Sequence, residues 1–115
     1  MRYLMLCCFE EKQWNALPAA QRDSIMRDYG ALMKRLDESG RHLGSAQLQP
    51  VANAVTIRGR NGKATVTDGP FAETKEQLGG YHLVECNDLD EALSIAKQIP
   101  TIPYGGTVEV RPLLT

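Results

Sequence analysis

The sequence predicts an α+β domain of the ferredoxin-like class, with the element order βαββαβ and a β-hairpin inserted in its middle. Two observations carry this prediction. Short apolar or alternating runs typical of strands stand at both ends of the chain and within residues 54–67 and 81–86, and two longer segments repeat apolar residues at helical spacing. The length of 115 residues fits one domain and leaves no room for a second.

The first strand and the first helix are predicted at the start of the chain. Residues Arg2 to Phe9 are apolar on both alternating faces, which is typical of a strand that is covered on both sides. The helix that follows should hold Pro18 in its first turn, where a missing N–H costs little. It should end at Ser39-Gly40, because glycine readily adopts the left-handed conformation that stops helices. Its apolar stripe is Ile25, Tyr29, Leu32, Met33 and Leu36.

A β-hairpin is predicted in the middle of the chain, after a short extended stretch near Leu43 to Leu48. Residues 54–57 and 64–67 are rich in β-branched side chains and flank Asn61-Gly62. That dipeptide suits the positive φ angles of a type I′ turn, so the two runs should pair as neighbouring antiparallel strands.

One helical turn and a further strand are expected after the hairpin. Thr74 and Gln77 have the spacing of a capping box, and Gly79-Gly80 would stop that turn. Residues Tyr81 to Cys86 combine aromatic and branched side chains and should form the next strand. The glycine pair also suits a close approach between strands.

The second helix and the last strand are predicted near the end of the chain. Asp88 should cap the helix, since Glu91 stands three residues on, and Pro100 should end it. Thr107 to Arg111 alternates and should form the last strand. The apolar stripe of the second helix is expected to be Leu89, Ala92, Leu93, Ala96 and Ile99.

The two helices can cover only one face of the sheet, although strand Arg2 to Phe9 is apolar on both faces. We therefore expect a homodimer whose sheets meet face to face. Val108 and Val110 should belong to the helix side, which places Glu109 and Arg111 on the uncovered face.

Composition restricts the classes of partner. The net charge of −1 leaves no cationic field for nucleic acid or an anionic membrane, and no apolar run approaches the ~20 residues of a membrane span. The three cysteines include an adjacent pair, Cys7 and Cys8, which fits neither a disulfide framework nor a metal site. We expect a cytoplasmic protein without a metal or an organic cofactor.

The segment VTDGPFAETKEQLGGYHLVECNDLDEALSIAKQIP, followed by GGTVEVRP, resembles the YCII-related family in its DGPF-type branch. The resemblance covers nearly the whole chain and implies a ferredoxin-like dimeric α+β barrel. Most such proteins are uncharacterised, one related member is linked to dehydrochlorination of chloroaromatic compounds, and DGPF-type proteins are associated with sigma factors of the extracytoplasmic-function class. YCII-type members are suggested to use a His/Asp acid–base pair. Asp68 could correspond to that aspartate, whereas no histidine stands in the first strand or the loop after it.

Asp68 is the first candidate for a catalytic residue. A turn aspartate usually accepts from the N–H two residues on, but residue 70 is a proline, so the carboxylate must bind elsewhere. Apolar neighbours such as Phe71 and Tyr81 would raise its pKa and suit it to acid–base work. The alternative is that Asp68 accepts from N–H groups of its own loop.

The other candidates are polar residues near the same sheet. Arg111, with Glu109, could orient an anionic or carbonyl-bearing substrate, or the two could form an interface salt bridge. Tyr81 could donate a hydrogen bond to substrate, and Glu73 is a surface charge that could face the pocket. His82 is either a packing residue of a central strand or a catalytic base.

These residues lead to three functional hypotheses. The first is a small-molecule acid–base enzyme of lyase or isomerase type, acting in a cleft between sheet and loop of the homodimer. The second is a non-catalytic module that binds a small ligand or docks on a regulator such as a sigma factor. The third is a dimer in which the same residues form only interface salt bridges.

Overall fold

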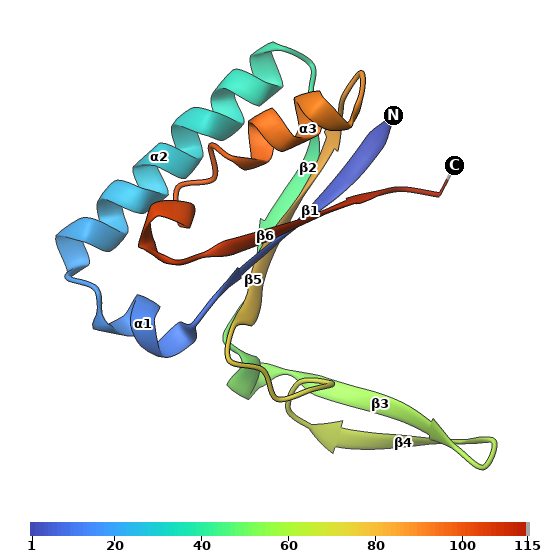
Figure 1. Cartoon of the computed structure of the whole chain (residues 1–115). Coiled ribbons are helices and arrows are strands. Elements are labelled where there is room, and N and C mark those ends of the chain that lie inside the picture. Colours follow the sequence, from blue (N-terminus) through green and yellow to red (C-terminus); the bar gives the residue numbers. More distant parts are fainter. Residues whose placement is uncertain (115) are drawn as a thin grey trace.

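The computed structural model describes residues 1–114 and has the predicted α+β architecture (Figure 1). Its main sheet is antiparallel and has the strand order β2-β5-β1-β6. Without the inserted hairpin, this is the ferredoxin-like order βαββαβ, as predicted from the sequence. The strands of this sheet are β1 (Arg2–Phe9), β2 (His42–Gln47), β5 (Gln77–Glu85) and β6 (Thr107–Pro112).

Two helices, α2 (Ala19–Glu38) and α3 (Leu89–Ala96), cover the same face of the sheet (Figure 1). Pro18 lies directly before α2, as its N-cap, and Gly40 follows the helix with a φ of +73°. Asp88 caps α3, because its Oδ1 accepts from the Glu91 N–H at 2.9 Å. Residues next to the helices therefore determine where α2 and α3 begin and where α2 ends.

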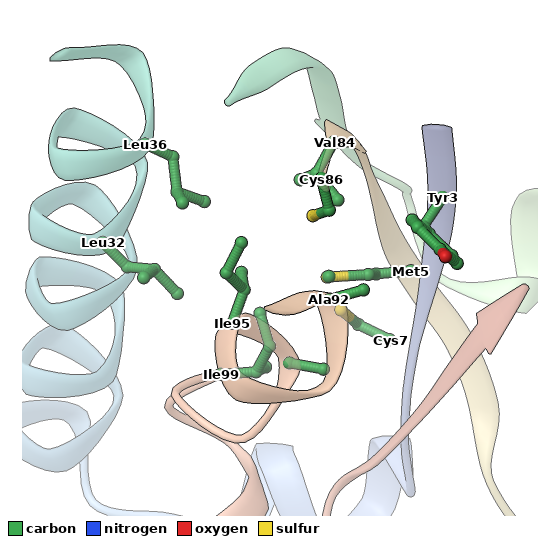
Figure 2. Close-up of a cluster of buried hydrophobic side chains, with 11 residues drawn as sticks. Tyr3, Met5, Cys7, Leu32, Leu36, Val84, Cys86, Ala92, Ile95 and Ile99 are labelled. Carbon is green, nitrogen blue, oxygen red and sulfur yellow. The ribbon is translucent and has the colours of Figure 1, made fainter. Parts of the chain in front are cut away.

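The hydrophobic core lies between this sheet face and the two helices (Figure 2). Met5 of β1 and Val84 of β5 are fully buried. Figure 2 shows Leu32 and Leu36 projecting from α2 toward the side chains of α3 and the sheet. The buried cluster consists of Tyr3, Met5, Cys7, Leu32, Leu36, Val84, Cys86, Ala92, Ile95, Ala96 and Ile99.

The opposite face of the sheet, here called the open face, carries no helix of the described chain (Figure 1). Leu4 and Leu6 of β1 lie on it and stay half-exposed. They pair with Arg111 and Glu109 of β6, while Val108 and Val110 pack against the core. The predicted division of β6 between the two faces is confirmed. Further residues of the open face are Cys8, Tyr81 and Leu83.

The inserted hairpin forms a separate two-stranded sheet of β3 (Val55–Arg60) and β4 (Lys63–Asp68). We call residues 55–68 the arm. Asn61 and Gly62 have φ angles of +52° and +76°, which fit the predicted type I′ turn. A 3₁₀ turn, η1 (Val51–Asn53), leads into the arm, which projects from one end of the main sheet away from the helices (Figure 1).

The predicted helical turn at Thr74–Gln77 is wrong. β5 already begins at Gln77, which pairs with Phe9, and Gly79 and Gly80 lie inside the strand. The Gln77 side chain instead donates from Nε2 to the Thr74 carbonyl at 2.7 Å. Pairing with β1 therefore outweighs the local capping signal.

Two helical features also differ from the expectation. A short helix, α1 (Glu11–Ala16), stands between β1 and α2, where the sequence predicts no element of its own. α3 ends at Ala96, before Pro100, and a 3₁₀ turn, η2 (Ile102–Tyr104), follows. Ile95 is buried in α3, whereas Leu89 and Leu93 are exposed, so the apolar stripe is rotated from the predicted one. No helix within residues 1–114 is long and apolar enough to span a membrane.

Candidate functional site

A cavity of about 600 Å³ lies between the helix-covered face of the sheet and the helices α1 and α2. It lies beside the end of β1 and the start of β5. Its walls come from β1, α1, α2, β2 and β5, so segments far apart in the sequence build it together. The lining residues include Cys7, Phe9, Glu11, Trp14, Met26, Tyr29, Met33, Ser45, Gln47, Gln77, Gly80, His82 and Thr101.

Gly79 and Gly80 make room for this cavity. The pairing of β5 with β1 shifts by one residue between Cys7 and Cys8, which leaves Gly79 as the extra residue of a β-bulge. Gly80 lies so close to β2 that a Cβ atom there would be 2.9 Å from the Ala46 carbonyl oxygen. The missing side chain therefore permits both the strand pairing and the open space on the helix side.

His82 is the most unusual residue of the cavity wall. Its side chain is buried, and Nδ1 has no hydrogen-bond partner within residues 1–114. Burial lowers the pKa of the imidazole below its ordinary value, and the charge of His42 adds to this effect. The ring is therefore neutral at neutral pH, and it belongs to the wall of a space that can hold a ligand. Such an unpaired atom costs about 1–3 kcal/mol and calls for a functional explanation.

Tyr29 of α2 packs on His82, with ring centroids 5.8 Å apart. Its hydroxyl lies 3.4 Å from Thr101 Oγ1. Burial raises the pKa of Tyr29 to about 12 and that of the Cys7 thiol to about 11. Both groups are neutral at physiological pH, which suits Tyr29 to donate a hydrogen bond and leaves Cys7 a poor nucleophile.

The helix α1 closes one end of the cavity with an aromatic wall. Trp14 meets Phe9 edge to face, with ring centroids 6.1 Å apart. Glu11 holds this helix in place, because its N–H donates to Gln77 Oε1 at 2.8 Å and its Oε2 accepts from the Val51 N–H at 3.1 Å. The carboxylate of Glu11 is thus engaged with the backbone of η1, the turn that leads into the arm.

The structure separates the two predicted catalytic residues. His82 lines the cavity, whereas Asp68 is exposed at the base of the arm and is not among the lining residues. Pro70 lies in the loop after Asp68, as the sequence requires, and Phe71 in that loop is exposed. Glu73 is also exposed and lies outside the cavity wall.

The predicted substrate-binding residues of β5 and β6 lie on the open face. Arg111 and Glu109 form an ion pair there, and both side chains are exposed. Tyr81 pairs with Leu6 on the same face. Since His82 is the neighbour of Tyr81 along β5, its side chain points to the opposite face, into the cavity. One chain therefore does not bring Arg111 and His82 into a common site.

Sequence reasoning did not single out Tyr29, Trp14 or Thr101 as site residues. The helical spacing of Tyr29 predicts a place in the apolar stripe of a helix, which its position in α2 also satisfies. The only tryptophan of the sequence, in a charged stretch after the first strand, was a usable signal. The glycine pair was a second signal, because strand glycines often mark a bulge or a close approach.

The chemistry of the cavity wall fits an organic ligand better than a metal ion. Within the described part of the chain, no three His, Cys, Asp or Glu side chains lie close enough to hold a metal. Besides the carboxylate of Glu11, the polar groups of the wall include amides, hydroxyls and one imidazole, among them those of Gln47, Ser45, Thr101 and His82. These groups can hydrogen-bond a carbonyl or hydroxyl group, while the aromatic wall can stack on a flat ligand.

Comparisons with known proteins identify the family of the chain. The chain is 41% identical over 114 residues to an uncharacterised protein of Rhizobium meliloti (strain 1021). The aligned region covers 98% of this chain and 92% of that protein. The chain was also compared with a solved structure, the 5-chloro-2-hydroxyhydroquinone dehydrochlorinase TftG of Burkholderia phenoliruptrix in complex with 2,5-dihydroxybenzoquinone. The two structures superpose over 99% of this chain and 94% of the TftG chain, with a TM-score of 0.49 and 14% sequence identity. That likeness is too weak to transfer an activity. The profile of the YCII-related domain matches residues 1–115, and the chain therefore belongs to the YCII-related family.

Proposed function

We propose that this protein is a small-molecule enzyme that works by acid–base chemistry, with His82 as the proton-transferring residue. One observation carries the proposal: a neutral, buried imidazole with an unpaired Nδ1 lies in the wall of a cavity of about 600 Å³. A buried titratable group with a displaced pKa in a cavity is a physical reason to suspect catalysis.

The proposed reaction begins with removal of a proton from the carbon next to a carbonyl group, as in lyases and isomerases that use acid–base catalysis. Neutral His82 accepts the proton, because its lowered pKa keeps a lone pair free at neutral pH. Negative charge then develops on the carbonyl oxygen of the substrate. The Tyr29 hydroxyl, neutral and backed by Thr101, is the group best suited to donate a hydrogen bond to that oxygen.

The cavity favours an uncharged carbonyl-bearing ligand over an anionic one. Glu11 is the one charged side chain among its lining residues, and it is acidic. An anion placed there would lose hydration without gaining a cationic partner. Arg111, which the sequence suggested as an anion-binding residue, lies on the other face of the sheet.

We further propose that the protein is a homodimer with the open faces of the two sheets in contact. Leu4, Leu6 and Leu83 leave apolar surface on that face, and no part of residues 1–114 covers it. In this dimer the Glu109–Arg111 ion pair lies at the interface. Asp68, at the base of the arm, takes part in catalysis only if a second copy brings it to a cavity.

The acid–base role can be tested without knowing the natural substrate. Uncharged cyclic and aromatic ketones are incubated with the protein in D₂O, and loss of the α-proton signal is followed by NMR. We expect exchange to fall by at least about 100-fold in His82→Gln, the lower end of what general acid–base groups contribute. Asp90→Asn is the control, because Asp90 is exposed in the first turn of α3, away from the lining residues, and its replacement should leave exchange unchanged.

Three outcomes would contradict this assignment. Equal exchange in the wild type and His82→Gln would remove His82 from the mechanism. Binding of the ketones without any exchange would favour the alternative function, a non-catalytic module that binds a small ligand. Loss of exchange in Asp68→Asn but not in His82→Gln would move the chemistry to the arm.

A further inference from the structure

The arm has one polar and one apolar face. Directly opposed residues of an antiparallel pair point to the same side, and the pairs Ile57 with Val66 and Val55 with Asp68 lie on one side. Val55, Ile57 and Val66 are 60%, 68% and 67% exposed. The other side carries Thr56, Arg58, Arg60, Lys63, Thr65 and Thr67.

The chain's own contacts with the arm lie on its polar face. The Thr56 hydroxyl donates to the Gly69 carbonyl at 2.7 Å, and the Arg58 guanidinium donates to the Phe71 carbonyl. The apolar face is left uncovered by residues 1–114. A two-stranded hairpin is at best marginally stable in water, because it has no second layer to bury its apolar side chains. A partner molecule is therefore needed to bury the apolar face of the arm.

The exposed surface of the chain has the size that a homodimer requires. A compact monomer of 12.7 kDa exposes about 6,200 Å². This chain exposes 7763 Å², about 1,500 Å² more. Its radius of gyration is 15.9 Å, against about 13 to 14 Å for a compact domain of this length. Obligate homodimers bury roughly 1,000 to 2,500 Å² on each protomer, so the excess matches one such interface.

A second copy of the chain is the partner that accounts for both uncovered apolar surfaces at once. The chain has an open sheet face and an arm that projects from the end of that sheet away from the helices (Figure 1). In a two-fold dimer each copy offers one arm and one sheet, so every contact is made twice. A different protein would have to match two separate apolar surfaces.

We propose that the apolar face of the arm packs on a second copy of the chain and extends the sheet-to-sheet contact. Ile57 and Val66 form the centre of this contact. Asp68 shares their face and is carried into the interface at the base of the arm. The inference goes beyond the proposed chemistry, since it concerns how the arm is held and applies whether or not His82 is catalytic.

The test compares variants on the two faces of the arm by sedimentation velocity over a range of concentrations. Ile57→Asp places a charge on the apolar face, and we expect its dimer dissociation constant to rise by at least about 100-fold. Thr65→Asp places the same charge on the polar face of the same hairpin and should stay within about threefold of the wild type. Near-ultraviolet circular dichroism checks that both variants keep the folded body.

A third variant separates the arm from the sheet contact. Leu6→Asp charges the open face, so we expect it to weaken the dimer as well. If Leu6→Asp dissociates the dimer while Ile57→Asp matches Thr65→Asp, the arm does not pack on the partner. A wild type that stays monomeric at micromolar concentration would also overturn the inference. Hydrogen exchange should show arm amides that become protected as the protein concentration rises.

Discussion

The helix-covered face of the main sheet and the apolar face of the arm are built from similar residues and differ in what covers them. Met5 on β1 is 0% exposed under α3, whereas Ile57 on β3 is 68% exposed. Both strands carry apolar side chains, but only one has a second layer within its own chain. Periodicity thus identifies an apolar face, while the number of helices decides whether that face is buried in the monomer or needs a partner.

Truncating one aliphatic side chain in each region is the strongest way to test this contrast. Met5→Ala should lower the free energy of unfolding by about 2–5 kcal/mol, because it opens a cavity in a closed core. Ile57→Ala should cost less than about 1 kcal/mol at sub-micromolar concentration, where association contributes least. Urea denaturation measures both. Equal losses would mean that the arm is as firmly packed within the monomer as the core.

The glycine pair of β5 gives the next largest expected effect. Gly80→Ala should destabilise the fold by about 1–3 kcal/mol, since its Cβ would press on the Ala46 carbonyl at 2.9 Å and push β2 from β5. Gly79→Ala is the matched control, because its Cβ would lie 3.9 Å from the Cys7 carbonyl. Thermal denaturation should therefore separate two adjacent variants of the same type. Equal melting temperatures would contradict the close approach at residue 80.

Replacing His82 should stabilise the protein while it removes the proposed chemistry. His82→Leu fills the same place without a buried unpaired nitrogen, so we expect a gain of about 1 kcal/mol at pH 7.5. Residues that serve function commonly reduce stability in this way. A clear loss of stability in chemical denaturation would show that His82 is mainly a packing residue.

The lowered pKa of His82 predicts a smaller, pH-dependent effect. Its folded pKa lies below the unfolded value of about 6.5, so the unfolded chain binds the proton more readily. The free energy of unfolding should therefore fall as the pH drops below about 6.5, by at most about 1.4 kcal/mol per unit. Tyr29 and Cys7 titrate far above this range. Denaturation at pH 7.5 and 5.5 should show a weaker pH dependence in His82→Leu than in the wild type.

Much of the fold is readable from the sequence because its signals are local. The Asn61-Gly62 turn, the Asp88 cap and the Gly40 stop each act within a few residues of their position. The short helix α1 has no side-chain cap and was missed. The expected turn at Thr74 failed because strand pairing between Gln77 and Phe9, distant in sequence, decides that region.

The candidate site was less predictable, because its parts meet only in three dimensions. The residue pattern of β5 identifies His82 as a strand residue. It does not show that a cavity lies beside His82. Tyr29 and Trp14 reach that cavity from two helices whose packing the sequence pattern does not specify. Asp68 is unusual for a turn aspartate, because Pro70 has no N–H to donate to its carboxylate. This local feature does not reveal that Asp68 lies on an exposed arm.

We expect the cavity around His82 to bind an uncharged carbonyl compound. Benzamide and benzoate are planar and nearly equal in size, and they differ in charge, so an NMR titration with both probes tests it directly. We predict that benzamide shifts the His82 imidazole and Trp14 indole signals and binds at least about tenfold more tightly than benzoate, a difference of about 1.4 kcal/mol. Shifts at Arg111 and Asp68 instead, with benzoate bound more tightly, would contradict the claim.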